Sequence, residues 1–137
     1  MNNECIRAII RRKKQLYRIE YYRDERGKSE FEEHLKRLIK TAKNSKESRI
    51  RYNTIDRYLR YLKGFGTANL PSDYAKIIIE NIWELRPDKY RILYFFFNND
   101  TYVILHHFEM KSRKTPKKEI EKAIRERNDY VRRNKQK

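Results

Sequence analysis

The stretch that decides the fold reads Trp83-Glu-Leu-Arg-Pro87, then Tyr90-Arg-Ile-Leu-Tyr-Phe-Phe-Phe97, then Thr101-Tyr-Val-Ile-Leu-His-His-Phe-Glu109. Its two longer runs are rich in β-branched and aromatic residues, and the Asn-Asn-Asp between them is a turn signal. They predict two antiparallel strands, residues 90–97 and 101–109, joined by a short turn. Basic residues follow at once, so one edge of this sheet should hold cations and imidazoles firmly enough to recognise a polyanion.

The chain before this stretch predicts one strand followed by two helices. Residues 16–23 alternate apolar with polar side chains, as in a half-buried strand. Ser29 and Glu32 form a capping box that begins a helix of about four turns. A second helix follows the polar break at residues 43–47, and Gly64 marks its expected end. Two successive helices predict an antiparallel helical hairpin.

The remaining segments complete the expected fold. Residues 76–86 predict a single strand, which a turn at Pro87 joins to the strand at 90–97. Thr115 as N-cap and Pro116 at the first helical position begin a last helix. The sequence therefore predicts an α+β domain: a mainly antiparallel four-stranded sheet, with the N-terminal helical hairpin and the C-terminal helix packed on one side of it.

Length and composition indicate one domain with an acidic partner. The 137 residues are 38% apolar, and 35 Lys and Arg against 19 Asp and Glu leave a net charge of +16. Such a charge favours nucleic acid, anionic lipid or an acidic protein as partner. We expect a domain over residues 16–133, a basic extension at 1–15 and a polar tail at 134–137.

The same composition argues against membrane insertion, secretion and a metal centre. No apolar run approaches the roughly 20 residues that span a bilayer, and no signal-peptide cleavage pattern is present. Cys5 is the only cysteine, which excludes an internal disulfide and suits the cytoplasm. Three histidines without a metal-binding spacing predict no metal site, and we expect no cofactor.

Cationic side chains gather where the expected strands end. Arg86 and Arg91 flank a turn, and a guanidinium group can hold a phosphate by two hydrogen bonds. The alternative for both is a surface ion pair with Glu84 or Asp88. Lys117 and Lys118 lie in the first turn of the last helix, where the helix dipole already favours an anion. The alternative there is a solvated basic turn.

Aromatic and imidazole groups extend this candidate site. Strict alternation places His106 on one face with Tyr102, and His107 on the other, so one imidazole should be buried against the helices and the other could face an open side of the sheet. Tyr90, Tyr94 and Tyr102 offer ring faces to unpaired bases. A ribose 2′-hydroxyl can attack the adjacent phosphate with a base, an acid and cations alone. The residues thus permit a metal-independent ribonuclease, but equally a binding module.

Four spaced motifs carry a resemblance to a known family: residues 82–87, 91–94, 105–108 and 114–121. They closely resemble HigB-like toxins of the RelE/ParE superfamily, many of them described as phage-derived proteins, and the resemblance spans about residues 16–133. It implies a RelE-like fold and a type II toxin–antitoxin toxin. Such a toxin is a cytoplasmic endoribonuclease that cuts messenger RNA on the ribosome, in contact with ribosomal RNA and without a metal.

The resemblance also implies partners and roles. The neutralising partner would be a HigA-like antitoxin with a helix-turn-helix domain, through which alone the complex would bind operator DNA. The expected roles are phosphate binding by Arg86, Arg91, Lys111 and Lys114, proton transfer by His106 or His107, and RNA binding by Arg113, Lys117, Lys118 and the three tyrosines. Met110 stands where relatives commonly carry a basic residue, so Lys111, Arg113 or Lys114 would take over that function.

Three other functions remain open from the sequence. A ParE-like toxin of the same fold would poison DNA gyrase rather than cut RNA. A non-catalytic nucleic-acid-binding protein would bind with a steep dependence on salt and leave messages whole. A chain that has lost toxicity, as Met110 allows, would act only as half of a repressor complex.

Overall fold

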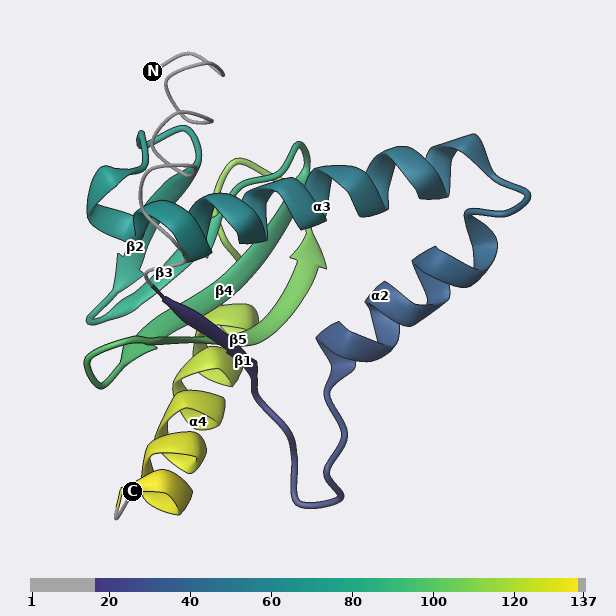
Figure 1. Ribbon diagram of the computed structural model, residues 1–137. Coiled ribbons are helices and arrows are strands. Elements are labelled where there is room, and N and C mark those ends of the chain that lie inside the picture. Colours follow the sequence, from purple (N-terminus) through teal and green to yellow (C-terminus); the bar gives the residue numbers. More distant parts are fainter. Residues whose placement is uncertain (1–16, 136–137) are drawn as a thin grey trace.

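A computed structural model describes residues 17–135, which form a strand, two helices, four strands and a final helix (Figure 1). The extension expected at 1–15 and the last two residues of the tail lie outside this range. The element bounds are β1 Arg18–Tyr21, α2 Glu30–Thr41, α3 Lys46–Phe65, the short 3-10 helix η1 Thr67–Asn69, β2 Ala75–Ile79, β3 Ile82–Leu85, β4 Tyr90–Phe97, β5 Thr101–Glu109 and α4 Lys117–Asn134.

The sheet has five strands in the order β1-β5-β4-β3-β2, so the prediction of four strands is wrong. The single strand predicted over residues 76–86 is a hairpin, because Glu80 adopts a left-handed backbone conformation (φ 50°) and turns β2 into β3. Apolar residues lie on both sides of this turn, so the sequence pattern predicts one continuous strand. β1 pairs with β5 in parallel, with Arg18 opposite Thr101, and the sheet is therefore mixed.

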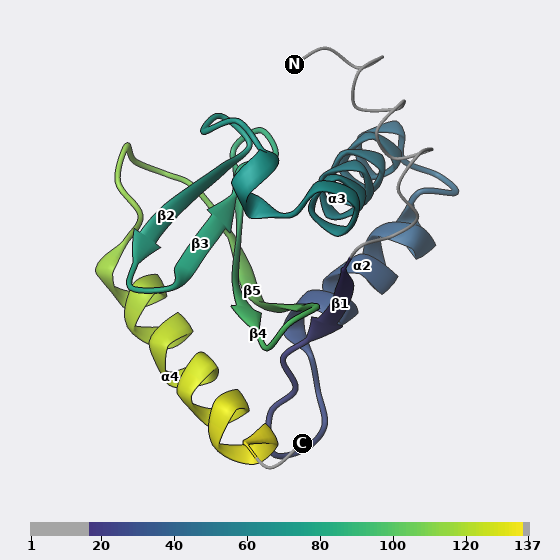
Figure 2. The same ribbon diagram turned by 60° about the vertical axis from the view of Figure 1, so that its left-hand side comes forward.

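Helices cover both faces of the sheet, which corrects the prediction that they lie on one side. The views in Figures 1 and 2 show α2 and α3 over one face and α4 across the other. α2 contacts β5, and α4 contacts β4 and β5. The helices of the predicted hairpin contact each other, but they diverge as an open V instead of running side by side (Figure 1).

Capping side chains and a glycine set the ends of α2 and α3. The Ser29 hydroxyl accepts a hydrogen bond from the Glu32 N–H, as predicted, and the Ser45 hydroxyl caps α3 in the same way. α3 continues past Gly64, which is buried, so the predicted end is wrong. The helix ends at Gly66, whose φ of 77° is a conformation that favours glycine.

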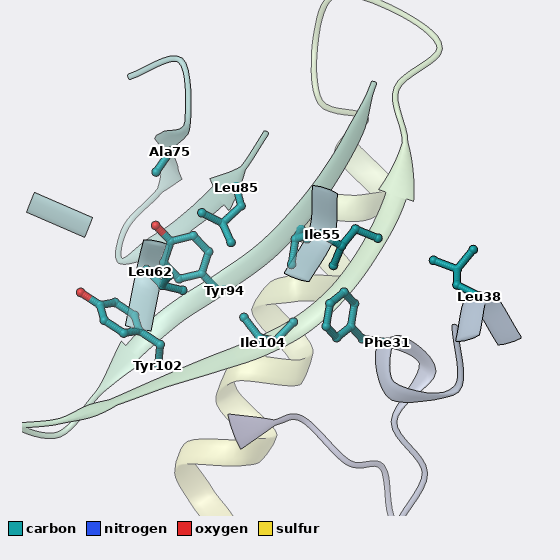
Figure 3. Packing of buried hydrophobic residues seen from close by; sticks show 10 residues of the cluster. Phe31, Leu38, Ile55, Leu62, Ala75, Leu85, Tyr94, Tyr102 and Ile104 are labelled. Atoms are coloured by element: carbon teal, nitrogen blue, oxygen red, sulfur yellow. The ribbon is translucent and has the colours of Figure 1, made fainter. Parts of the chain in front are cut away.

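Each face of the sheet has its own apolar cluster. On the α2/α3 face, Phe31, Leu62, Ile104 and two tyrosines, Tyr94 and Tyr102, pack together (Figure 3). The cluster on the α4 face consists of Ile82, Leu93, Phe95, Val103, Leu105, Ala123 and Tyr130. Both faces of β4 and β5 therefore belong to the core.

A β-bulge in β5 changes the orientation of its histidines. Leu93 lies opposite His106 and Tyr94 lies opposite Ile104, so Leu105 is an extra residue in β5. As a result His106 faces α4, and His107 faces α2. The prediction that the two imidazoles point in opposite directions is confirmed. The predicted grouping of His106 with Tyr102 is wrong, because the bulge interrupts the alternation.

Candidate active site

A buried carboxylate, that of Glu84 in β3, lies at the centre of the candidate site. Strand alternation sends Leu85 into the α2/α3 core, so Glu84 faces the opposite side, where it is only 3% exposed. Its two oxygens lie 3.8 Å from Arg86 Nε and 3.9 Å from Arg91 Nε. One carboxylate thus holds two guanidinium groups together, and the pair keeps a net positive charge.

The two guanidinium groups are only partly satisfied by the protein. Arg91 Nη1 donates to the carbonyl oxygens of Asp88 (2.8 Å) and Tyr90 (2.7 Å), which fixes the direction of its side chain. The Nε atoms of Arg86 and Arg91 are both buried without a hydrogen-bond partner among the described residues. Burial, and then the charge of Arg86, lower the pKa of Arg91. A bound anion would relieve both the missing hydrogen bonds and the charge repulsion.

The basic loop before α4 is tied to this carboxylate. The Thr115 hydroxyl donates to Glu84 Oε2 at 3.1 Å, and at the other end the Met110 N–H donates to the Lys89 carbonyl at 2.7 Å. The prediction that Thr115 caps α4 is wrong, because its hydroxyl is used here and Pro116 occupies the cap position without a side-chain hydrogen bond. The exposed side chains of Lys111, Arg113 and Lys114 lie between these two anchors.

His106 fixes α4 to the sheet. It is 1% exposed, its Nδ1 lies 2.5 Å from Glu126 Oε1, and its Nε2 lies 3.4 Å from Glu119 Oε1. Both glutamates belong to α4. The imidazole is therefore enclosed between the sheet and the helix, with its nitrogens directed at carboxylates rather than at a surface that a substrate can reach.

His107 lies on the other face, away from the arginine pair. Its ring stacks on His34 with 4.1 Å between centroids and meets Phe31 edge-on at 5.7 Å. Burial, followed by the neighbouring His34, lowers the pKa of His107 to about 4. The imidazole is thus neutral at neutral pH. Sequence alternation predicted one histidine on an open face of the sheet, whereas helices cover both.

The three tyrosines predicted to stack on bases occupy different environments. Tyr94 is fully buried and shares a hydrogen bond with the Thr67 hydroxyl, and Tyr102 accepts one from the Thr67 N–H. Neither ring has a face available for a base in this structure. Tyr90 is half-buried, with the Arg51 guanidinium 4.5 Å above its ring. Only this one of the three tyrosines keeps the predicted opportunity for stacking.

Lys117 and Lys118 are exposed in the first turn of α4, directly after the basic loop. Lys117 Nζ lies 3.9 Å from Glu121 Oε1, four residues along the helix, in a solvent-exposed ion pair of small energy. The two lysines extend the positive charge of the loop along the start of α4. Their predicted contact with RNA stays a prediction.

Sequence reasoning missed Glu84 and Thr115 as parts of the site. Glu84 was expected only as a possible surface partner of an arginine, and Thr115 only as a helix cap. A signal was present, because a carboxylate between Trp83 and Leu85 interrupts a strand that is otherwise apolar. A charged residue at such a position is buried only when it has partners.

Residues 17–135 contain no group of three or more His, Cys, Asp and Glu side chains that could hold a metal ion. Within the same range, no helix is both long enough and apolar enough to cross a bilayer.

The chain matches one known protein family. The family model described as phage-derived protein Gp49-like matches residues 45–128, more than half of the chain. The chain therefore belongs to this family, which is toxin-like and related to RelE and HigB. The matched range includes the Glu84 carboxylate, both arginines and the basic loop. A search of curated proteins finds no match.

Proposed function

We propose that this member of the Gp49-like family is the toxin of a type II toxin–antitoxin pair and cuts messenger RNA on the ribosome without a metal ion. Membership of a toxin-like family supports the first part. The arginine pair on Glu84, beside a loop of exposed cations, carries the second part. Two fixed guanidinium groups with free N–H donors suit a phosphate group that gains charge during reaction.

In the proposed reaction, the ribose 2′-hydroxyl loses its proton to a base and its oxygen attacks the adjacent phosphorus. The bond from phosphorus to the 5′ oxygen breaks, and an acid protonates that oxygen. The products are a 2′,3′-cyclic phosphate and a 5′-hydroxyl end. Arg86 and Arg91 neutralise the non-bridging oxygens. Lys111 and Lys114 are our candidates for the proton transfers, because both are exposed on the loop that Thr115 ties to Glu84.

We assign no proton transfer to the histidines. His106 is enclosed by Glu119 and Glu126, and His107 faces α2 on the far side of the sheet. In this proposal His106 holds α4 in place. Met110 is half-buried and its N–H is bonded to Lys89, so a cation that relatives carry at that point is replaced by Lys111 or Lys114 on the same loop.

Glu84 acts in this proposal as a positioning residue. Its carboxylate partly offsets the repulsion between two neighbouring guanidinium groups and fixes both at the end of the sheet. Through Thr115 it also fixes the distance between the arginines and the lysine-bearing loop. Correct placement of charged groups before reaction is a large part of such catalysis.

The proposed partners follow from charge and from the family. The net charge of +16 suits ribosomal and messenger RNA. A HigA-like helix-turn-helix antitoxin would neutralise the toxin and would connect the complex to operator DNA. We place the protein in the cytoplasm, where both partners occur.

Brief induction of the protein without an antitoxin, followed by mapping of transcript 5′ ends, tests the proposal. We expect growth arrest and new 5′-hydroxyl ends within translated codons. A DNA-damage response with intact transcripts would replace our proposal with gyrase poisoning. Harmless expression with whole messages would indicate a binding protein or a co-repressor.

A further inference from the structure

A small pocket lies between the first half of α3 and the turn that joins β3 to β4. Its volume is about 150 Å³, well below the roughly 300–1,000 Å³ of sites for drug-sized ligands. Its apolar walls come from Ile50, Ile55, Pro87 and the Tyr90 ring. A space of this size and lining suits one flat ring rather than a large molecule or a peptide segment.

The pocket is adjacent to the arginine pair but on the other side of β4. Tyr90 and Arg91 are consecutive residues of a strand, so their side chains point to opposite faces. Asp88 belongs to both places, because it lines the pocket and its carbonyl oxygen accepts a hydrogen bond from Arg91. A strand of RNA that passes around this turn would reach the pocket and the arginines with neighbouring nucleotides.

The polar groups of the pocket are unusual in so basic a protein. Two carboxylates, those of Asp88 and Glu47, line it, and Asp88 forms no ion pair within residues 17–135. Carboxylates repel a phosphate, but they accept hydrogen bonds from the exocyclic amine of a base. The Arg51 guanidinium, 4.5 Å above the Tyr90 ring and 3.1 Å from Glu47, adds a flat cationic wall on which a base can stack.

We infer that this pocket binds one unpaired nucleobase that carries an exocyclic amine, next to the phosphate held by Arg86 and Arg91. The inference rests on the proposed function in so far as both require single-stranded RNA as the ligand. Cytosine fits because its amine can donate to Asp88 or Glu47. Uracil has the same size but presents a carbonyl oxygen at that position, which the carboxylates repel. The pocket thus determines base preference at the cleavage site.

Binding of two labelled RNA hexamers, one of cytidines and one of uridines, tests this inference directly. Their backbones carry the same charge, so phosphate contacts cancel in the ratio of the two dissociation constants. We expect the full-length protein to bind the cytidine hexamer at least about fivefold more tightly. Equal affinities would overturn the inference. A cytidine preference that stays the same in a variant of the pocket would also overturn the inference.

Two variants and one control make the assignment specific. Asp88→Asn keeps the backbone carbonyl that holds Arg91, tolerates the φ of 58° and can donate to uracil, so the preference should disappear. Thr54→Phe fills the pocket from α3 and should lower cytidine binding to the level of uridine. Asp73→Asn removes an exposed carboxylate elsewhere and should keep the preference.

This outcome is independent of the outcome for cleavage. The protein could prefer cytidine, lose this preference in Asp88→Asn, and still cut no message. That result would support the base-binding pocket and reject the proposed nuclease activity. If the protein cuts messages but binds both hexamers equally, the nuclease activity would be supported and the base-binding pocket would be rejected. An amino-acid side chain of a partner protein as the occupant would also leave the two hexamers equal.

Discussion

The helices on the two faces of the sheet are held by different kinds of contact. α2 and α3 pack through apolar side chains, with Phe31, Leu62 and Ile55 almost fully buried. α4 also packs on an apolar cluster, with Ala123 and Tyr130 buried and Ile124 and Val131 partly buried, but charged or polar groups tie it to its neighbours along its length as well. These groups include Glu119 and Glu126 at His106, Lys122 at Glu30, Arg127 at Glu80 and Asp129 at Tyr22.

This difference between the two faces separates the part of the fold that mainly supplies stability from the part that carries the candidate site. Apolar packing on the α2/α3 face supplies free energy of folding and does not depend on charge. The α4 face places Glu84 and its arginines beside a polar network, where charged groups are kept close together at an energetic cost. The candidate site lies on the α4 face, where polar contacts add to the smaller of the two apolar clusters.

Truncation of the apolar face should have the largest effect. Phe31→Ala removes a ring that is 0% exposed and packs against Tyr21 and His107, so we expect the free energy of unfolding to fall by about 3–5 kcal/mol. Urea denaturation measures it. Ile39→Ala, in the same helix at 51% exposure, should cost less than about 0.5 kcal/mol. Similar losses in both variants would contradict the assignment of the core.

Acid should weaken the same face through His107. The unfolded imidazole takes up a proton near pH 6.5, but the folded one only near its pKa of about 4. The stability that it contributes is therefore present above pH 6.5 and is lost as the pH falls toward 4, by about 2–3 kcal/mol. His107→Phe keeps a ring against His34 and should flatten this part of the stability profile. An unchanged profile in the variant would refute the assignment.

The ion pair between Lys122 and Glu30 joins α4 to α2, and its loss should have the smallest effect. The atoms Nζ and Oε2 lie 2.7 Å apart, but the side chains are 33% and 63% exposed. Lys122→Met should lower the free energy of unfolding by at most about 1 kcal/mol, and less in high salt. A loss of several kcal/mol in urea denaturation would mean that polar ties hold the two faces together more strongly than we infer.

The sequence predicted those elements whose signals are local. β4 and β5 have the expected bounds because their apolar runs are interrupted by a strong turn signal. α2 begins at its predicted cap, because Ser29 and Glu32 interact within one turn. The parallel pairing of β1 and the helices on both faces depend on contacts between distant segments, which local patterns do not encode.

The site shows the same limit. Arg86 and Arg91 lie together as their positions around one turn predicted, but the buried carboxylate between them depends on pairing of β3 with β4. One bulged residue in β5 was enough to exchange the faces of His106 and His107. A shift of one residue in the strand places each following side chain on the opposite face of the sheet, and hydrophobic alternation alone does not reveal such a shift.

The central claim is that the arginine pair on Glu84 binds the phosphate at which the RNA is cut. The cleavage rate of the Arg91→Lys variant tests this claim most directly. Lysine keeps the charge beside Glu84 but lacks the fork that holds a phosphate at two points. In a translation mixture with one defined message, we predict that its cleavage rate falls about 100-fold. Arg57→Lys, on the exposed surface of α3, should cut at the wild-type rate. A full cleavage rate in Arg91→Lys would contradict the account.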